Sequence, residues 1–183
     1  ETDENEIQEF FTQVNPQERS MRIDSRGARF LGEAHEKVIS FLRDAQANGD
    51  SAGGTVELHA SGMPKSLGQP VFHKLKSDLA SAMLSLGATA AFELGTGVGA
   101  AESKGQEFHA QSNSKRYGGI RGGISTGEDL ILRVHFKPTS SILDVAKQGR
   151  HDPCIVPRAV PVVEAMTALV LADHVLWDRL SRV

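Results

Sequence analysis

The clearest strand signal in the chain is an alternation of apolar and polar side chains from residue 130 to residue 137. Alternate residues of a strand share a face, so this pattern predicts one apolar face and one face carrying Arg133, His135 and Lys137. Two shorter segments with the same period, Thr55–Ala60 and Thr89–Leu94, are predicted to be strands as well.

Three other segments show apolar residues at helical spacing. They are Ala28–Asn48, which Gly49 would end, Val71–Leu86, and Ala159–Leu180, where Pro161 is tolerable only near the first turn. Helices, strands and glycine-rich connections together predict an α+β fold. The expected buried stripe of the second helix is Phe72, Leu75, Leu79, Met83 and Leu86, and the expected core residues of the last helix are Met166, Leu169, Val170 and Val175.

Composition places the chain among ordinary globular proteins. A length of 183 residues with 39% hydrophobic and 23% charged residues suits one domain that buries a core without disulfides or metal. Cys154 is the single cysteine, and no uninterrupted apolar run reaches the roughly 18 residues of a membrane span. We therefore expect a reduced, cytoplasmic protein that does not enter a membrane.

Charge is unevenly distributed along the chain. Five of the first ten residues are acidic, so residues 1–21 are predicted to be a peripheral segment and residues 22–183 the folded region. The net charge of −3 argues against a nucleic-acid partner. The segment from Arg133 to Arg158 is nevertheless cationic, which favours a small anionic ligand, although a solvated face with scattered lysines and arginines is an equal alternative.

Two polar segments near the predicted strand at 130–137 are candidate ligand sites. Gly118–Gly127 holds five glycines in ten residues, and its Ser125 and Thr126 could donate to an anion; the alternative is a glycine-rich hairpin without a ligand. Lys137–Ser141 follows the strand with one cation and three hydroxyls, which predicts a phosphate cradle or, alternatively, a polar turn.

The densest group of ionisable side chains lies in the segment Gly149–Cys154. Arg150 can bind phosphate with its planar fork, and Asp152 could relay a proton, although a surface salt-bridge set is the plainer alternative. Cys154 is interpreted as a small packing residue rather than a nucleophile. The segment Gly95–Ala100 superficially fits a dinucleotide fingerprint, but its continuation is too short and polar for the required helix.

Three of these segments, taken in order, closely resemble the chorismate synthase family. They are Gly118–Gly127 (GGIRGGISTG), Phe136–Ile142 (FKPTSSI) and the long, specific Gly149–Met166 (GRHDPCIVPRAVPVVEAM). Upstream, Gly49–Gly54, Gly68–Phe72 and Lys76–Ala80 look like that family in the right order, so the resemblance runs from about Arg22 to the C-terminus.

The resemblance implies a partial copy of a β-α-β sandwich and, in a full-length protein, a homotetramer. It implies 1,4-anti elimination of phosphate from 5-enolpyruvylshikimate 3-phosphate to give chorismate, with reduced FMN as cofactor and no net redox change. Asp152 matches an acid that handles a proton beside the flavin. The implied FMN contacts are Gly87, Ala88, Gly122, Lys137, Pro138, Thr139, Ser140, Ser141 and Arg150, where Gly87 replaces the usual asparagine and would contribute backbone only.

The chain also departs from the family pattern. The N-terminal motifs that supply two catalytic histidines are not found in it, and the loops after Ile142 and around Ser103–Arg116 are short. We therefore expect little turnover from this chain alone. The alternative function is a non-catalytic module, derived from the same scaffold, that binds FMN or phosphate or serves oligomerisation.

Overall fold

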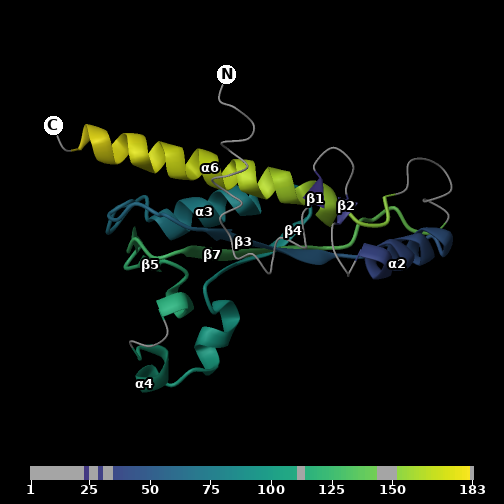
Figure 1. The fold of residues 1–183 in the computed structure, drawn as a ribbon, viewed down its shortest axis with the longest axis horizontal. Helices are drawn as coiled ribbons and strands as arrows, with labels where there is room; N and C mark the ends of the chain where they lie inside the picture. Colours follow the sequence, from purple (N-terminus) through teal and green to yellow (C-terminus); the bar gives the residue numbers. More distant parts are fainter. Residues whose placement is uncertain (1–22, 25–28, 31–34, 111–113, 144–151, 182–183) are drawn as a thin grey trace.

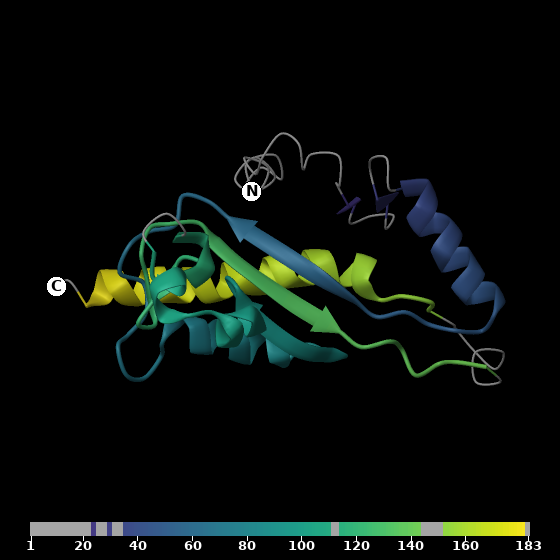
Figure 2. The same cartoon turned by 90° about the horizontal axis from the view of Figure 1, so that it is seen from below.

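The computed structural model describes residues 23–24, 29–30, 35–110, 114–143 and 152–181. Its centre is a three-stranded antiparallel sheet, seen in Figures 1 and 2, made of β3 (Gly54–Ala60), β7 (Leu130–Phe136) and β4 (Thr89–Leu94) in the order β3-β7-β4. All three predicted strands are confirmed. The predicted segment 1–21 lies outside the described residues.

The sheet has one covered and one open face. Two helices, α3 (Leu75–Leu84) and α6 (Val156–Leu180), lie side by side on the covered face, where α3 packs on β4 and α6 on β3 (Figure 1). The alternation in β7 works as predicted, because Leu132 and Val134 are fully buried under the helices while Arg133 lies on the open face. The predicted α+β class is therefore confirmed, with a single helical layer against the described sheet.

The helix α3 is shorter than the sequence pattern indicates. It begins at Leu75 instead of Val71, because Lys74 still has extended backbone angles and His73 has a φ of +55°. The expectation that Phe72 is buried is wrong, since it is 79% exposed, whereas Leu79 and Met83 are fully buried as predicted.

The helix α6 differs from the prediction in start and in phase. It begins at Val156, one turn earlier than expected, so Pro161 falls in the second turn, where it cannot donate to the Pro157 carbonyl. The residues that face the sheet most closely are Val163 and Thr167, and the predicted core residue Leu169 is 66% exposed, which corrects that expectation. Met166, Val170 and Val175 are half-buried against the core.

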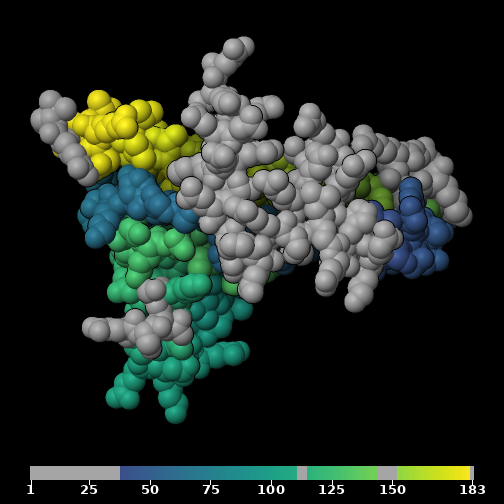
Figure 3. Space-filling view, in the orientation of Figure 1, coloured from purple at the N-terminus to yellow at the C-terminus, as the bar shows by residue number. Residues whose placement is uncertain are grey.

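The remaining described elements extend from the two ends of the sheet. The helix α2 (His35–Ala47) lies within the predicted first helix, and the short strands β1 (Ile23–Asp24) and β2 (Arg29–Phe30) pair with each other. A lobe projects on the side of the sheet away from the helices (Figures 1 and 3). It contains the 3-10 helices η2 (Gly97–Glu102) and η3 (Ser114–Tyr117) and the short helix α4 (Gly105–Phe108).

By length and composition alone, α6 is long and apolar enough to cross a membrane. The core helix of a globular protein can meet the same criterion, and α6 packs one side on the sheet. The expectation that the chain does not enter a membrane stays a prediction.

Candidate functional site

The C-terminal end of β7 gathers most of the described residues that the sequence singles out. The strand ends at Phe136 and continues into Lys137–Ser141, while the turn Gly87–Ala88 precedes the neighbouring strand β4. The Lys137 amide donates to the Ala88 carbonyl at 2.9 Å, which joins the two segments. We call this group, together with Asp152, the sheet-end site.

Hydrogen bonds from two further segments, Ser51–Ala52 and Asp152–Pro153, hold the sheet-end site together. The Ser51 hydroxyl donates to the Thr139 carbonyl at 2.7 Å, and the Thr139 hydroxyl donates to the Asp152 carbonyl at 2.9 Å. The Ala52 amide donates to the Pro153 carbonyl at 2.8 Å. The segment after β7 is therefore fixed on both sides, while Lys137 and Ser140 remain exposed.

Asp152 lies directly before α6 and is paired there. Its carboxylate accepts from the guanidinium of Arg158 in the first turn of that helix, and its side chain is 21% exposed. Burial and the neighbouring Asp152 charge raise the pKa of the Cys154 thiol, although a hydrogen bond with the Val156 backbone lowers it. Because a raised pKa keeps the thiol protonated, a nucleophilic role for Cys154 is disfavoured, as expected. Arg150 lies outside the described residues.

Gly122 is not part of the sheet-end site. It lies in the turn of a hairpin formed by β5 (Ile120–Arg121) and β6 (Ile124–Ser125), which precedes the opposite end of β7. The seven residues of β7, roughly 20 Å of strand, separate this turn from Lys137. The segment Gly118–Gly127 is therefore a glycine-rich hairpin, the alternative that the sequence left open.

The hydroxyls of this hairpin are already used within the protein. Ser125 is 4% exposed; its hydroxyl donates to the Pro64 carbonyl at 2.5 Å and accepts from the Leu67 amide at 2.9 Å. The Thr126 hydroxyl lies 3.2 Å from the Gly119 carbonyl. The idea that these two residues donate to an anion is replaced by a structural role that pins the hairpin to the loop after β3.

Sequence reasoning missed three contributors to the sheet-end site. Ser51 bonds to the Thr139 carbonyl, and Arg158 pairs with the Asp152 carboxylate. Only the Arg158 contact had a signal in the sequence, because Arg158 stands six residues after Asp152. The Thr89 hydroxyl, next to Ala88, is buried and has no hydrogen-bond partner among the described residues. Buried hydroxyls nearly always have one, so this atom is available to a bound group.

These groups fit the phosphorylated cofactor that the sequence resemblance implies. The Lys137 ammonium and the exposed Ser140 hydroxyl are donors suited to phosphate. A Cβ placed on Gly87 would meet nothing within 4 Å, so the backbone of this turn is open to a ligand. The donor set therefore suits a phosphorylated ligand such as the FMN that the resemblance implies.

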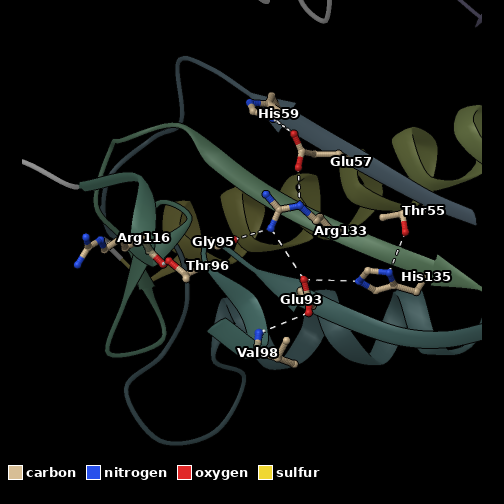
Figure 4. Close-up of polar contacts among 10 residues, drawn as sticks. All are labelled: Thr55, Glu57, His59, Glu93, Gly95, Thr96, Val98, Arg116, Arg133 and His135. Atoms are coloured by element: carbon tan, nitrogen blue, oxygen red, sulfur yellow. Dashed lines mark hydrogen bonds and ion pairs between the residues drawn. The ribbon is translucent and has the colours of Figure 1, made fainter. Parts of the chain in front are cut away.

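A second polar group crosses the open face of the sheet (Figure 4). Arg133 on the central strand lies between two glutamates on the outer strands, 2.5 Å from Glu57 and 3.8 Å from Glu93. His59 lies 2.7 Å from Glu57, and His135 lies 3.5 Å from Glu93 and 2.9 Å from the Thr55 hydroxyl. We call these residues the open-face ladder.

The groups of the open-face ladder are only partly paired, because Arg133 faces two glutamates and the buried Nε2 of His135 makes no hydrogen bond within the described part of the chain. Burial acts to raise the pKa of Glu57, but hydrogen bonds and charge from His59 and Arg133 outweigh it and hold that pKa below its ordinary value. A hollow of about 460 Å³ lies beside Glu93, between α3, β4 and η2, and none of the described predicted site residues lines it. The ladder is therefore a cross-strand structural network.

Fold and site together define an α+β protein in which lysine, hydroxyl and aspartate side chains gather at one end of an antiparallel sheet. A family model described as chorismate synthase matches residues 3–176. The chain therefore belongs to the chorismate synthase family.

Individual relatives agree with this assignment. The chain is 63% identical over 161 residues to the chorismate synthase of Bdellovibrio bacteriovorus, covering 88% of this chain and 47% of that protein. It is 43% identical over 166 residues to that of Opitutus terrae, covering 79% of this chain and 45% of the relative. The chain thus spans about half the length of the curated relatives it matches.

A solved structure confirms the fold. A crystal structure of chorismate synthase superposes with a TM-score of 0.73 at 27% sequence identity, over 95% of this chain and 53% of that one. The described elements are therefore a partial copy of the chorismate synthase fold, as the sequence resemblance implies.

Proposed function

We propose that this chain contributes the flavin- and phosphate-binding part of a chorismate synthase. The reaction is the 1,4-anti elimination of phosphate from 5-enolpyruvylshikimate 3-phosphate to give chorismate. The observation that carries the proposal is the convergence of Ala88, Lys137–Ser141 and Asp152 at one end of the sheet. These residues come from three separate parts of the sequence.

We assign binding to the exposed Lys137 and Ser140 and the half-buried Ser141 of the sheet-end site. The Lys137 ammonium and the hydroxyls of Ser140 and Ser141 bind a phosphate group, while the Gly87–Ala88 turn offers its backbone. Pro138 and the bonded Thr139 keep this segment in place. Arg150 adds a planar, bidentate cation from the neighbouring segment.

We assign the proton transfer of the reaction to Asp152. Its carboxylate receives and returns a proton beside the flavin, while Arg158 orients it and Thr139 fixes its backbone. Reduced FMN, when bound, would supply an electron-rich ring, and the elimination leaves no net oxidation or reduction.

The site is completed by groups beyond this chain. The catalytic histidines belong to the part of a family-length protein that the chain does not match, so the isolated chain binds ligand with little turnover. Gly122 cannot contact the same phosphate as Lys137 within one copy, and a neighbouring copy of the proposed cytoplasmic homotetramer can supply it.

The decisive experiment compares binding with turnover. Flavin titration of the 183-residue chain should show FMN binding that Lys137→Ala weakens and the exposed-residue control Lys104→Ala does not. Phosphate release from the substrate, measured anaerobically with pre-reduced FMN, should be low for the chain. It should appear when the rest of the Bdellovibrio protein is fused to it. Robust turnover by the chain alone would refute the assigned division of labour, and binding without turnover in the fusion would favour the non-catalytic module.

Two variants in that fusion separate binding from chemistry. Arg150→Lys keeps the charge but loses the bidentate fork, so it should weaken flavin or substrate binding. Asp152→Asn keeps the shape and removes the proton carrier, so it should lower single-turnover rates far more than FMN affinity. An Asp152→Asn enzyme with an intact rate but no flavin binding would make Asp152 a positioning residue.

A further inference from the structure

Two histidines from different segments meet one aspartate at the N-terminal end of α3. Asp78 lies in the first turn of that helix. Its Oδ2 atom lies 2.9 Å from Nε2 of His174, which is on α6, and 3.4 Å from Nδ1 of His73, which is in the loop before α3. We call these three residues the His–Asp–His cluster. It is separate from the sheet-end site and from the open-face ladder.

The two histidines differ in burial and in bonding. The His174 side chain is 3% exposed, and its Nε2 atom donates to the Asp78 carboxylate, because an ionised carboxylate only accepts. The His73 side chain is 57% exposed, and its Nδ1 atom lies beyond the length of an ordinary N–H···O bond. His174 is therefore bonded while neutral, whereas His73 would gain an ion pair with the same oxygen on taking up a proton.

The backbone and a tryptophan hold His73 in this position. His73 has a φ of +55°, in the left-handed region that few residues other than glycine adopt, and its carbonyl accepts from the Gln69 amide at 3.1 Å. The ring of Trp177 on α6 lies 4.8 Å from that of His73 and 6.3 Å from that of His174. The loop is thus turned so that the His73 imidazole reaches both the carboxylate and the indole.

The charged groups around the cluster come from each neighbouring element. On α6, Asp178 borders with His174 a cavity of about 30 Å³. In the loop, the stem of Lys74 lies against Gly123 of the β5–β6 hairpin, and on α3 Lys76 borders the hollow beside Glu93. Two carboxylates therefore face the imidazoles, while the stems of the two nearest lysines lie against other surfaces.

A histidine in this setting responds to pH near neutrality. Its side chain ordinarily changes charge between about pH 5 and 8, and a nearby carboxylate favours the charged form. We propose that the His–Asp–His cluster is a proton-responsive junction, in which His73 takes up a proton from solvent and pairs with Asp78 while neutral His174 keeps its hydrogen bond to the same carboxylate. This inference does not depend on the proposed reaction.

The sign of the pH dependence follows from the two groups. The pair is present where His73 is protonated and Asp78 is ionised, so it is lost as the pH rises above about 6.5 and again as it falls below about 4. The loop is then held most firmly on α3 in mildly acidic solution. The Leu75 amide donates to the Gly123 carbonyl at 2.8 Å, so the same closure steadies the hairpin that contains Gly122.

The first test follows the emission of Trp177, the single tryptophan, while the 183-residue chain is titrated from about pH 8 to 5. Protonated imidazole quenches indole emission more strongly than neutral imidazole, so the emission should fall. Asp78→Asn should move the midpoint down by about 0.5 pH unit or more, or abolish the transition. The control Asp44→Asn, exposed on α2, should leave the midpoint unchanged.

Three results would overturn the proposal. They are emission that does not change with pH in the wild type, a midpoint that Asp78→Asn leaves unchanged, and a transition that survives in His73→Gln. The last result would assign the proton to His174.

The second test uses a fusion of this chain with the rest of the Bdellovibrio protein, so it stays informative if the isolated chain does not fold. Hydrogen exchange of residues 69–75 is measured at pH 6 and pH 8 and corrected for the intrinsic effect of pH. Protection should be about two- to fivefold higher at pH 6, as expected of a partly exposed ion pair, and should be equal at both pH values in Asp78→Asn. Equal protection in the wild type would overturn the proposal, whether or not the fusion releases phosphate.

Discussion

Truncating two leucines to alanine tests the orientation of the helices on the sheet. Leu79 on α3 is fully buried in the core cluster, whereas Leu169 on α6 is 66% exposed. The change in chemistry is identical, so a difference in stability reports the environment of each side chain. We expect Leu79→Ala to be severe and Leu169→Ala to be nearly silent in the isolated chain.

The magnitudes follow from burial. A fully buried Leu→Ala truncation loses transfer free energy and leaves a cavity, so Leu79→Ala should cost about 3–5 kcal/mol. Leu169 has about a third of its surface buried, and full burial of a leucine is worth about 1.5–3 kcal/mol. The higher helix propensity of alanine offsets part of that loss, which leaves roughly 0.5 kcal/mol or less.

The assay is urea unfolding followed by the fluorescence of Trp177, the single tryptophan of the chain. Trp177 lies on α6 with its ring 4.8 Å from that of His73, so it reports whether α6 is docked. Thermal midpoints should fall by about 6–20 °C for Leu79→Ala and by about 2 °C or less for Leu169→Ala. Equal losses for both variants would show that α6 is rotated from the orientation described here.

Three further predictions concern the open face of the sheet and the hairpin of β5 and β6. Glu57→Gln should reduce stability at neutral pH by up to about 1 kcal/mol. Because folding lowers the pKa of Glu57, the stability difference between Glu57→Gln and wild type should shrink as the pH falls below the ordinary value of 4.5. Urea unfolding at several pH values measures this difference, and a difference that grows on acidification would contradict the prediction. Gly122 has a φ of +61° and open space around it, so Gly122→Ala should lower the free energy of unfolding by about 1–2 kcal/mol. Gly118→Ala should lower it clearly more, because a Cβ there would lie 2.6 Å from a β7 carbonyl oxygen. Equal thermal shifts for the two variants would refute this. Ser125→Ala should cost about 1–3 kcal/mol by leaving the buried Leu67 amide without its partner, and an unchanged urea midpoint would argue against that bond.

The strands could be predicted because their apolar residues all lie on one face and their polar residues on the other. In β7, residues facing the helices are apolar and Arg133 and His135 face the other way, so period and phase can both be determined from sequence. The phase of α6 could not be determined in this way. Apolar residues lie on two of its sides, so Leu169 fits a helical stripe as well as Val163 does, and only the position of the sheet distinguishes them.

The ends of the helices depend on backbone geometry that periodicity does not carry. Val71 and Phe72 extend the apolar pattern of α3, but the left-handed conformation at His73 and the extended one at Lys74 delay the helix to Leu75. The Leu75 amide then bonds to the Gly123 carbonyl of a distant hairpin, a contact that no local window contains.

The residues of the sheet-end site could be predicted from the sequence, but the contacts that bring them together could not. Lys137–Ser141 and Asp152 stand out by residue type, and family resemblance joined them to Ala88. The contacts that assemble them come from far along the chain, as with Ser51 and Thr139. Their residue types alone gave no signal for such pairings.

The position of β7 at the centre of the sheet has a consequence for how the protein is made. Among the described strands, β3 and β4 pair only with β7 and not with each other, and residues 61–129 separate β3 from its partner. During synthesis neither strand can complete a hydrogen-bonded ladder until residue 136 has left the ribosome, and the cover supplied by α6 arrives still later. Such non-local pairing has a high contact order, which slows folding and leaves two strand edges exposed in the growing chain. Refolding from urea should therefore begin on the covered face, where α3 can form locally, and wait for β7 to bring the two outer strands together.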